Sequence, residues 1–99
     1  MITLSHFQDR IFYMAYKQSE KHPHLMALEE KAARFLKAEL KRADVTYEQL
    51  AEKLKAHGFE ETKASIANKL VRGTFPASFM LAAMRVIGKE DVSLSEIYD

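Results

Sequence analysis

The chain has 99 residues, of which 47% are hydrophobic and 29% are charged, and its 15 Lys and Arg against 14 Asp and Glu give a formal net charge of +1. This length and balance fit one soluble globular domain. The lack of cysteine excludes disulfides, thiolate metal sites and cysteine nucleophiles. Because no apolar run approaches the roughly 18 residues of a membrane span and no signal peptide is visible, we expect a cytoplasmic protein.

The sequence offers little for catalysis or metal binding. His22 and His24 stand two apart, His6 and His57 lie far away, and no carboxylate or thiolate completes a ligand set at a familiar spacing. No nucleophile, base and acid stand at a usable spacing, and no phosphate-binding loop is present. We therefore expect no enzyme activity, no metal, no cofactor and no small-molecule substrate.

The scarcity of helix-breaking residues predicts the fold class. Gly and Pro together number only five, and no run alternates apolar and polar residues as a half-buried strand does. We expect an all-α protein in two parts, an N-terminal helical extension over residues 1–24 and a domain over residues 25–99.

A first helix is predicted from residue 5 to about residue 19. Its apolar stripe consists of Phe7, Ile11, Met14 and Ala15. Three more aromatic residues lie largely off that stripe, namely Phe12, Tyr13 and Tyr16. A helix with aromatic residues on more than one side needs a cover, and we favour a partner over the chain's own domain. Pro23 disfavours helix before it and ends this element.

The strongest helical pattern runs from Leu25 or Leu28 to Arg42. Its apolar residues share one face: Leu28, Ala32, Phe35, Leu36 and Leu40. Glu29 and Glu30 near its start suit the positive end of the helix dipole. Basic side chains from Lys31 to Arg42 face outward as solvated charges, and those near the end of the helix are candidates for a phosphate contact.

Residues 45–73 predict two short helices joined by a turn. Thr46 fits the N-cap of the first helix, and Gln49 stands three residues on, as in a capping box. The buried stripe of this helix consists of Tyr47, Leu50, Ala51 and Leu54. Gly58 supplies the left-handed residue that ends it, and Phe59 is expected to turn into the core.

The second helix of this stretch follows Thr62, another N-cap type, and buries Ile66 and Leu70. At about 100° per residue, its outward side carries Ala64, Ser65, Asn68 and Arg72, with Lys69 at the edge. Asn pairs with adenine, Arg with guanine and Lys with phosphate. Because no Asp or Glu occurs between Thr62 and Gly88, this side is a candidate DNA-binding surface. The alternative is a solvated face that happens to be basic.

The remaining chain predicts two more helical segments. Pro76 suits the start of a helix whose buried stripe is Phe79, Ala82, Ala83, Val86 and Ile87. Met80, Leu81 and Met84 lie beside that stripe, so this helix is either central in the core or part of an interface. Gly88 ends it. Ser93 and Glu96 fit a capping box for a final turn, in which Leu94 and Ile97 close the core.

Together these phrases resemble the phage-repressor-type helix-turn-helix superfamily, which includes the Cro and xenobiotic-response-element-like domains. The resemblance covers about residues 29–98 and rests on Val45–Leu54, Ser65-Ile66, Arg72-Gly73, Pro76, Gly88 and Ser93–Ile97. It implies a five-helix repressor-type helix-turn-helix domain with an extra N-terminal helix. Within that superfamily the chain is most similar to a small bacterial family known only as a domain of unknown function. The shared phrases are Leu36–Arg42, Glu60–Thr62 and Asn68-Lys69.

The chain departs from the superfamily between the two motif helices. Residues 55–61 stand where typical members have a short turn, so we expect a longer first helix and a wider connection. Glu60 and Glu61 stabilise the start of the second helix through its dipole but repel phosphate there. Tyr47 stands where Gln is usual and can still donate to phosphate.

Two functions are consistent with these features. The first is a DNA-binding transcriptional regulator whose contact residues are Tyr47, Lys63, Ala64, Ser65, Asn68, Lys69 and Arg72. Such a protein is expected to bind double-stranded DNA as a homodimer, through residues 5–19 or the C-terminal helices, and to read half-sites roughly 34 Å apart. The second is a helical protein-interaction module that has kept the fold without DNA binding. The long turn, the near-neutral net charge and the aromatic N-terminal helix favour the second.

Overall fold

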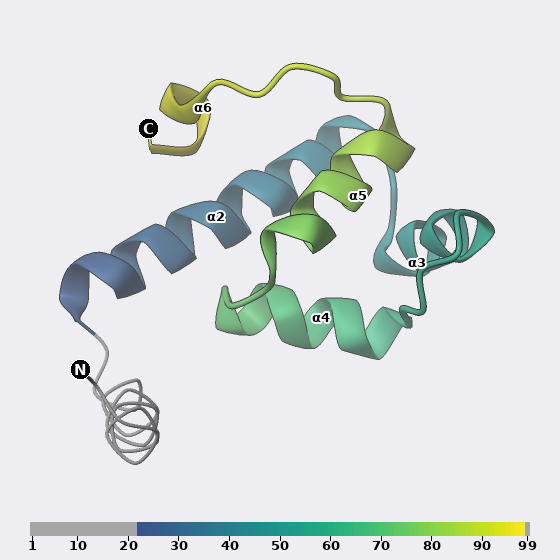
Figure 1. Cartoon of the computed structure of the whole chain (residues 1–99), viewed down its shortest axis with the longest axis horizontal. Coiled ribbons are helices and arrows are strands. Elements are labelled where there is room, and N and C mark those ends of the chain that lie inside the picture. The colour runs from purple at the N-terminus through teal and green to yellow at the C-terminus, as the bar shows by residue number, and fades with distance from the viewer. Residues whose placement is uncertain (1–21, 99) are drawn as a thin grey trace, which may run out of the picture.

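The structure, a computed structural model, describes residues 22–98. Within that range it contains five α-helices and no strand: α2 (Pro23–Arg42), α3 (Tyr47–Ala56), α4 (Lys63–Arg72), α5 (Ala77–Ile87) and α6 (Leu94–Tyr98). The predicted all-α class is confirmed for these residues, and the helix expected over residues 5–19 lies outside them. The long helix α2 packs against α4 and α6, and α3 packs against both α4 and α5 (Figure 1).

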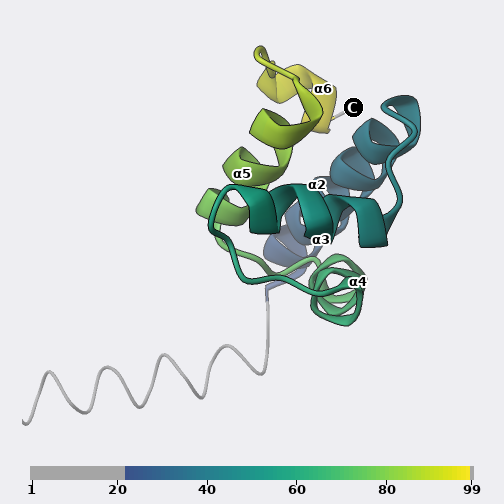
Figure 2. The same cartoon turned by 90° about the vertical axis from the view of Figure 1, so that its right-hand side faces the viewer.

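The helices α3 and α4 cross each other steeply. Each is seen end-on in the view in which the other lies in the plane (Figures 1 and 2). Thr46 caps α3 as predicted, because its side chain accepts from the Gln49 amide at 3.1 Å and the Gln49 side chain accepts from the Thr46 amide at 2.9 Å. Both hydrogen bonds satisfy amides that the first turn of a helix leaves free.

The hydrophobic core lies where α3 and α4 meet α2 and α5. The predicted inward pairs of both helices are almost fully buried: Leu50, Leu54, Ile66 and Leu70. They meet the stripe of α2, formed by Phe35, Leu36 and Leu40, and the stripe of α5, formed by Phe79, Ala82, Ala83 and Met84. The periodicity predicted the inward pairs of α3 and α4, but two details of the other helices differ. In α5 Met84, expected beside the stripe, is buried, whereas Val86 and Ile87 are only partly buried. In α2 Ala33 is buried, whereas Ala32 is partly exposed.

The start of α2 differs from the prediction. The helix begins at Pro23, so the expected boundary between residues 24 and 25 falls inside it, and His24 is helical rather than in a loop. The Nδ1 atom of His22 accepts from the His24 amide at 3.2 Å and caps the helix. Leu28, expected in the core, is 48% exposed, because the start of α2 projects beyond the other described helices (Figure 1).

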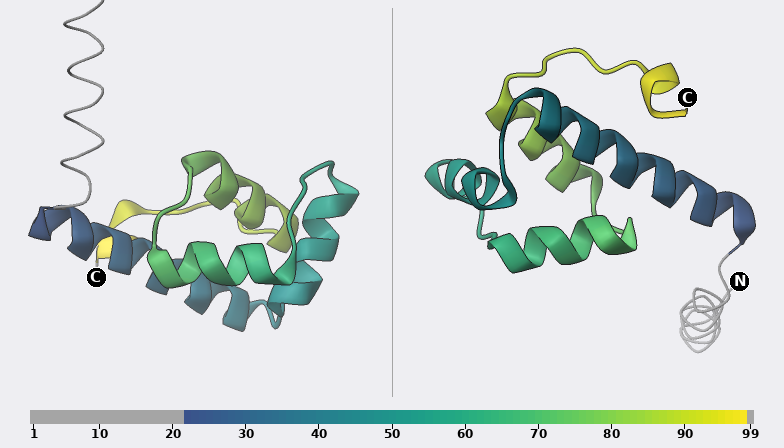
Figure 3. Two further views of the ribbon diagram at one scale, coloured as in Figure 1. Left: turned by 90° about the horizontal axis from the view of Figure 1, so that it is seen from below. Right: turned by 180° about the vertical axis from the view of Figure 1, so that it is seen from behind.

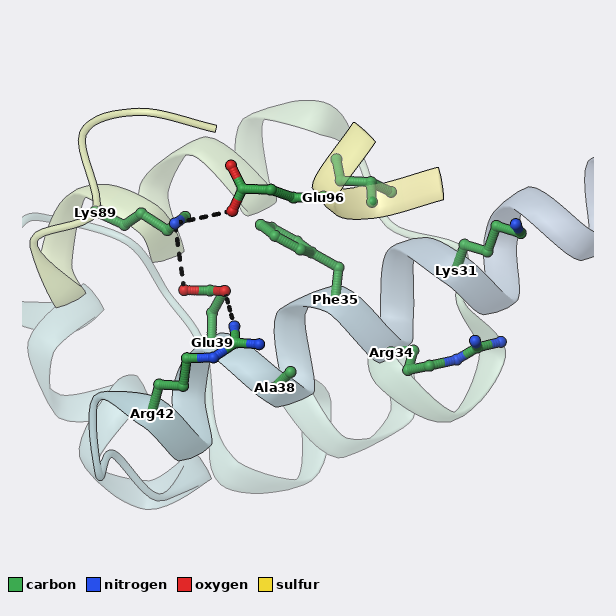
Figure 4. A pocket seen from close by; sticks show the side chains of 9 residues that line it. Lys31, Arg34, Phe35, Ala38, Glu39, Arg42, Lys89 and Glu96 are labelled. Atoms are coloured by element: carbon green, nitrogen blue, oxygen red, sulfur yellow. Dashed lines mark hydrogen bonds and ion pairs between the residues drawn. The ribbon is translucent and has the colours of Figure 1, made fainter. Parts of the chain in front are cut away.

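The short α6 lies along α2 and is attached to it by polar contacts. Lys31 donates to the carbonyl oxygen of Tyr98. Lys89 Nζ lies 3.1 Å from a carboxylate oxygen of Glu96 and 3.6 Å from one of Glu39, which also pairs with Arg42 (Figure 4). Glu39 is buried on the side of α2 that faces the C-terminal segment, and these two cations compensate its charge.

Two expectations for the C-terminal segment need correction. Glu96 accepts from the Ser93 amide at 2.8 Å, as a capping box requires, but the Ser93 hydroxyl accepts from the Ser95 amide at 3.3 Å instead of the Glu96 amide. Leu94 is 62% exposed, whereas Ile97 packs on the core. Among the helices described, none is long and apolar enough to span a membrane.

Candidate nucleic-acid interface

The helix α4 has a fixed start and a fixed end. The Thr62 hydroxyl accepts from the Ser65 amide at 3.0 Å, and the Ser65 hydroxyl accepts from the Thr62 amide at 2.8 Å. This capping box confirms Thr62 as the predicted N-cap, with Ser65 in the place usually taken by Glu or Gln. At the other end Gly73 adopts φ of +71° and donates to the Lys69 carbonyl at 2.9 Å.

The outward side of α4 presents four of the predicted contact residues to solvent. All four are exposed, and Ala64, Asn68 and Arg72 lie opposite the buried Ile66 and Leu70, whereas Lys63 is exposed at the first residue of the helix. Figure 3 (left), seen from below, looks onto this side of the helix. Lys63 stands at the first turn, and Ala64, Asn68 and Arg72 follow one another at helical spacing. Together they form a small, basic and acid-free surface, which we call the α4 face.

Ser65 and Lys69 are instead partly buried and bound by Glu61. One Glu61 carboxylate oxygen accepts from the Ser65 hydroxyl at 2.6 Å, and both oxygens lie 3.0 Å from Lys69 Nζ. Lys69 also lies 5.3 Å from the centre of the Phe79 ring, within the range of a cation–π contact. The structure therefore does not join these two side chains to the exposed α4 face.

Tyr47 is also placed apart from the α4 face. It is partly buried against the core at the start of α3 and lines a shallow cavity with Lys37 and Lys41 of α2. Its nearest cationic neighbours therefore come from α2. The structure divides the seven predicted contact residues into three groups. Lys63, Ala64, Asn68 and Arg72 are exposed on α4, Ser65 and Lys69 contact Glu61, and Tyr47 lies beside α2.

The wide connection between α3 and α4 explains the position of Glu61. The helix α3 ends at Ala56, and Gly58 takes the predicted left-handed conformation with φ of +88°. The Phe59 amide then donates back to the Leu54 carbonyl at 2.9 Å. Phe59 is predicted to turn into the core, but it is 45% exposed and lines a surface cavity with Leu54 and Phe79. The extra residues let the chain return to α4 with the Glu61 carboxylate against Lys69.

One exposed residue of α4 was not predicted to contact a ligand. Val71 is 80% exposed and lies on the outward side with Ala64 and Asn68. Apolar side chains at such positions contact the thymine methyl group in the major groove. The signal was present in the sequence, because Val71 is the apolar residue of this helix that falls well off the stripe of Ile66 and Leu70.

The two described residues whose pKa is shifted, Lys89 and Glu96, lie away from the α4 face. The Ser93 amide and the Lys89 ammonium lower the pKa of Glu96 below its ordinary value. The hydrogen bond to Glu96 is the main cause that raises the pKa of Lys89. Within residues 22–98 no three His, Asp or Glu side chains come together in a way that could hold a metal ion.

Comparisons with known proteins give a family but no activity. The family described as "Domain of unknown function (DUF6471)" matches residues 28–92. No curated protein and no solved structure matches the chain. The matched range spans α3, α4 and α5 completely and most of α2. This agrees with the resemblance to a family known only as a domain of unknown function, whereas the repressor-type superfamily stays a prediction.

Proposed function

The chain belongs to the DUF6471 family, whose description names no activity, and from its geometry we propose that it is a DNA-binding protein, a small transcriptional regulator that places α4 in the major groove. The observation that carries this proposal is the α4 face, on which Asn68 and Arg72 are exposed beside Ala64. Asn and Arg are the side chains that read adenine and guanine edges bidentately.

The fixed ends of α4 support this role. Capping at Thr62 and Gly73 holds the helix rigid before binding, so little conformational entropy is lost when it enters a groove. The steep crossing of α3 and α4 also fits a repressor-type helix-turn-helix, in which the first helix crosses the backbone and the second enters the groove. The repressor-type fold is therefore part of the proposal, as is a homodimer that spans two half-sites.

The first test is fluorescence anisotropy with a random duplex at low salt. It compares the wild-type chain with Asn68→Ala/Arg72→Ala and with Ser78→Ala/Arg85→Ala. The second pair makes the same charge change at exposed positions of α5. We expect the wild type and the α5 pair to bind alike and the α4 pair to bind more weakly.

Binding that survives in the α4 pair would move the contact to other basic residues, such as those between Lys37 and Arg42. No binding by wild-type protein that circular dichroism shows to be folded would favour a protein-interaction module. One observation favours that second candidate: Leu25, Met26 and Leu28 are each about half exposed at the start of α2. Apolar residues exposed next to one another are typical of protein-binding surfaces.

A further inference from the structure

Cationic residues from two helices line one open cavity beside the end of α4. The cavity has a volume of about 300 Å³, and Arg34 and Lys37 of α2 line it together with Arg72 of α4. Figure 4 shows Arg34 extending away from the cluster of Glu39, Arg42 and Lys89. The fold thus brings Arg72 of α4 beside Arg34 and Lys37 of α2, which lie far from it in the sequence.

A close backbone contact fixes the position of this cavity. Gly73 follows Arg72 directly and is buried against α2. A Cβ atom at Gly73 would lie 2.6 Å from the Glu29 carbonyl oxygen, nearer than two non-bonded atoms can come without a shift. Because only glycine permits this approach, the end of α4 is held against α2 at Glu29.

The three cations lack a carboxylate partner in the part of the chain that the structure describes. Arg34, Lys37 and Arg72 take part in none of the ion pairs among residues 22–98, whereas Lys69 and Lys89 are each held by carboxylates. Glu30 is the one carboxylate that lines the cavity, so three positive charges face one negative charge. Like charges around one cavity repel each other, and a bound anion would relieve that repulsion.

We propose that Arg34 and Lys37 of α2 bind a phosphate of the DNA backbone beside the groove that α4 enters, while Arg72 at the edge of the same cavity reads a base. This proposal rests on the proposed function and deepens it. The planar guanidinium group of Arg34 matches phosphate oxygens in a bidentate manner, and the ammonium group of Lys37 adds a point charge. Such contacts orient a protein on the duplex without reading its sequence, so α2 sets the pose in which the α4 face reads bases.

The test measures binding of the full chain to a random duplex across a salt series. It compares wild type, Arg34→Gln, Arg34→Lys and Arg85→Gln. Arg85 is exposed on α5 and lines a different cavity, so its substitution is a matched loss of charge. For Arg34→Gln we expect the slope of log K against log salt to become shallower by about 0.9, which is roughly eightfold weaker binding at 0.1 M salt. The loss should be equal for all duplex sequences.

The variants Arg34→Lys and Arg85→Gln distinguish a specific phosphate contact from a general effect of positive charge. Arg34→Lys keeps the charge but loses the bidentate geometry, so its salt slope should match wild type while its affinity falls between those of wild type and Arg34→Gln. Arg85→Gln should match wild type in both. Equal losses in Arg34→Gln and Arg85→Gln would overturn the phosphate site and leave the role of the α4 face standing. No duplex binding by folded wild type would overturn both proposals.

A titration with inorganic phosphate distinguishes a backbone phosphate from the free ion. Amide chemical shifts of Arg34 and Gly73 would be followed in sodium phosphate and in sodium chloride of matched ionic strength. Saturable shifts that are lost in Arg34→Gln, in a protein that does not bind duplex, would assign the site to free phosphate and overturn the backbone proposal. The proposal of a backbone phosphate is supported if free phosphate gives no saturable shifts and Arg34→Gln has the shallower salt slope on the duplex.

Discussion

The carboxylate of Glu61 holds the Lys69 ammonium 3.0 Å from each of its two oxygens, across the start of α4. This contact neutralises a lysine that would otherwise stand at the edge of the α4 face. Replacing Glu61 with Gln should release Lys69 toward a phosphate, steepen the salt slope by about 0.9 and tighten duplex binding by roughly eightfold at 0.1 M salt. The same change should lower the free energy of unfolding by about 1 kcal/mol, because a hydrogen-bonded ion pair is lost.

Glu60→Gln is the matched control for that prediction. Glu60 is the neighbouring residue, is exposed, and carries the same charge, but within residues 22–98 it forms no ion pair. Its substitution should leave stability within about 0.5 kcal/mol of wild type and the salt slope unchanged. Anisotropy and urea unfolding measure both quantities. If the two variants bind equally tightly, Lys69 does not reach the DNA.

Gly73 is expected to be the least replaceable glycine of the described chain. Gly73→Ala adds a methyl group that faces the Glu29 carbonyl and places alanine at φ of +71°. The left-handed conformation costs about 1–2 kcal/mol and the forced separation of α2 and α4 about 1–3 kcal/mol more. Gly58→Ala has φ of +88° with no atom within 4 Å, so it should cost only the first amount. Urea unfolding of both variants tests this, and equal losses would mean that the α2–α4 contact adapts freely.

Val71 should contribute to DNA specificity rather than to stability. Because its side chain is 80% exposed, Val71→Ala should change the free energy of unfolding by less than about 0.5 kcal/mol. On a duplex that wild type selects from a random pool, loss of a thymine methyl contact should weaken binding roughly fourfold, since one buried methyl is worth about 0.8 kcal/mol. Replacing the contacted thymine with uracil should weaken wild type equally and Val71→Ala no further. Leu81→Ala, at an exposed position of α5, is the control and should bind as wild type does.

The attachment of α6 should weaken in acid. The pKa of Glu96 is lowered in the folded protein, first by the Ser93 amide and then by Lys89. A carboxylate with a lowered pKa stabilises the fold above its ordinary value of 4.5, and this contribution is lost as the pH falls through the folded value. Wild type should therefore exceed Glu96→Gln in stability at pH 7, and the gap should close as the pH drops below 4.5.

Urea unfolding at a series of pH values measures that gap. Glu90→Gln serves as the control, because Glu90 is an exposed carboxylate of the same segment for which the structure gives no ion pair. It should show no pH-dependent difference from wild type. A gap for Glu96→Gln that stays constant down to pH 3 would mean that the side chain contributes through packing and not through its charge.

Local patterns in the sequence predicted much of this fold. The positions of Thr46, Thr62 and Gly88 as helix boundaries follow from capping chemistry, which acts within a few residues. The inward pairs of α3 and α4 follow from helical period alone. Predicting these features does not require knowing which element packs against the helix, so a single sequence is sufficient.

The predictions that were wrong depend on how one element packs against another. Leu28 continues an apolar stripe but lies at the projecting start of α2 (Figure 1), and the length of a partner element cannot be read from the stripe itself. The apolar character of Phe59 predicts an inward position, whereas the structure leaves it 45% exposed after the turn at Gly58. The sequence shows Glu61 only as a negative charge near the start of α4, because its contact with Lys69 depends on the path of the connection between α3 and α4.

The same limit applies to the candidate interface. Helical period predicted that Asn68 and Arg72 face outward, which the structure confirms. It could not predict that Arg72 shares a cavity with Arg34 and Lys37, because that meeting depends on how α4 crosses α2. The close approach at Gly73 decides this crossing, and the sequence shows only a glycine after a helix.

The contact between Lys31 and Tyr98 joins residues 67 positions apart, and this separation bears on folding kinetics. Contacts that close such a long loop form late, because the ordering of the chain must come before the contact can stabilise it. We expect α2, α3, α4 and α5 to assemble in the transition state and α6 to join afterwards. Variants at α6, such as Glu96→Gln, should then accelerate unfolding while leaving the folding rate almost unchanged. The C-terminal turn should also open in native-state hydrogen exchange before any other described helix.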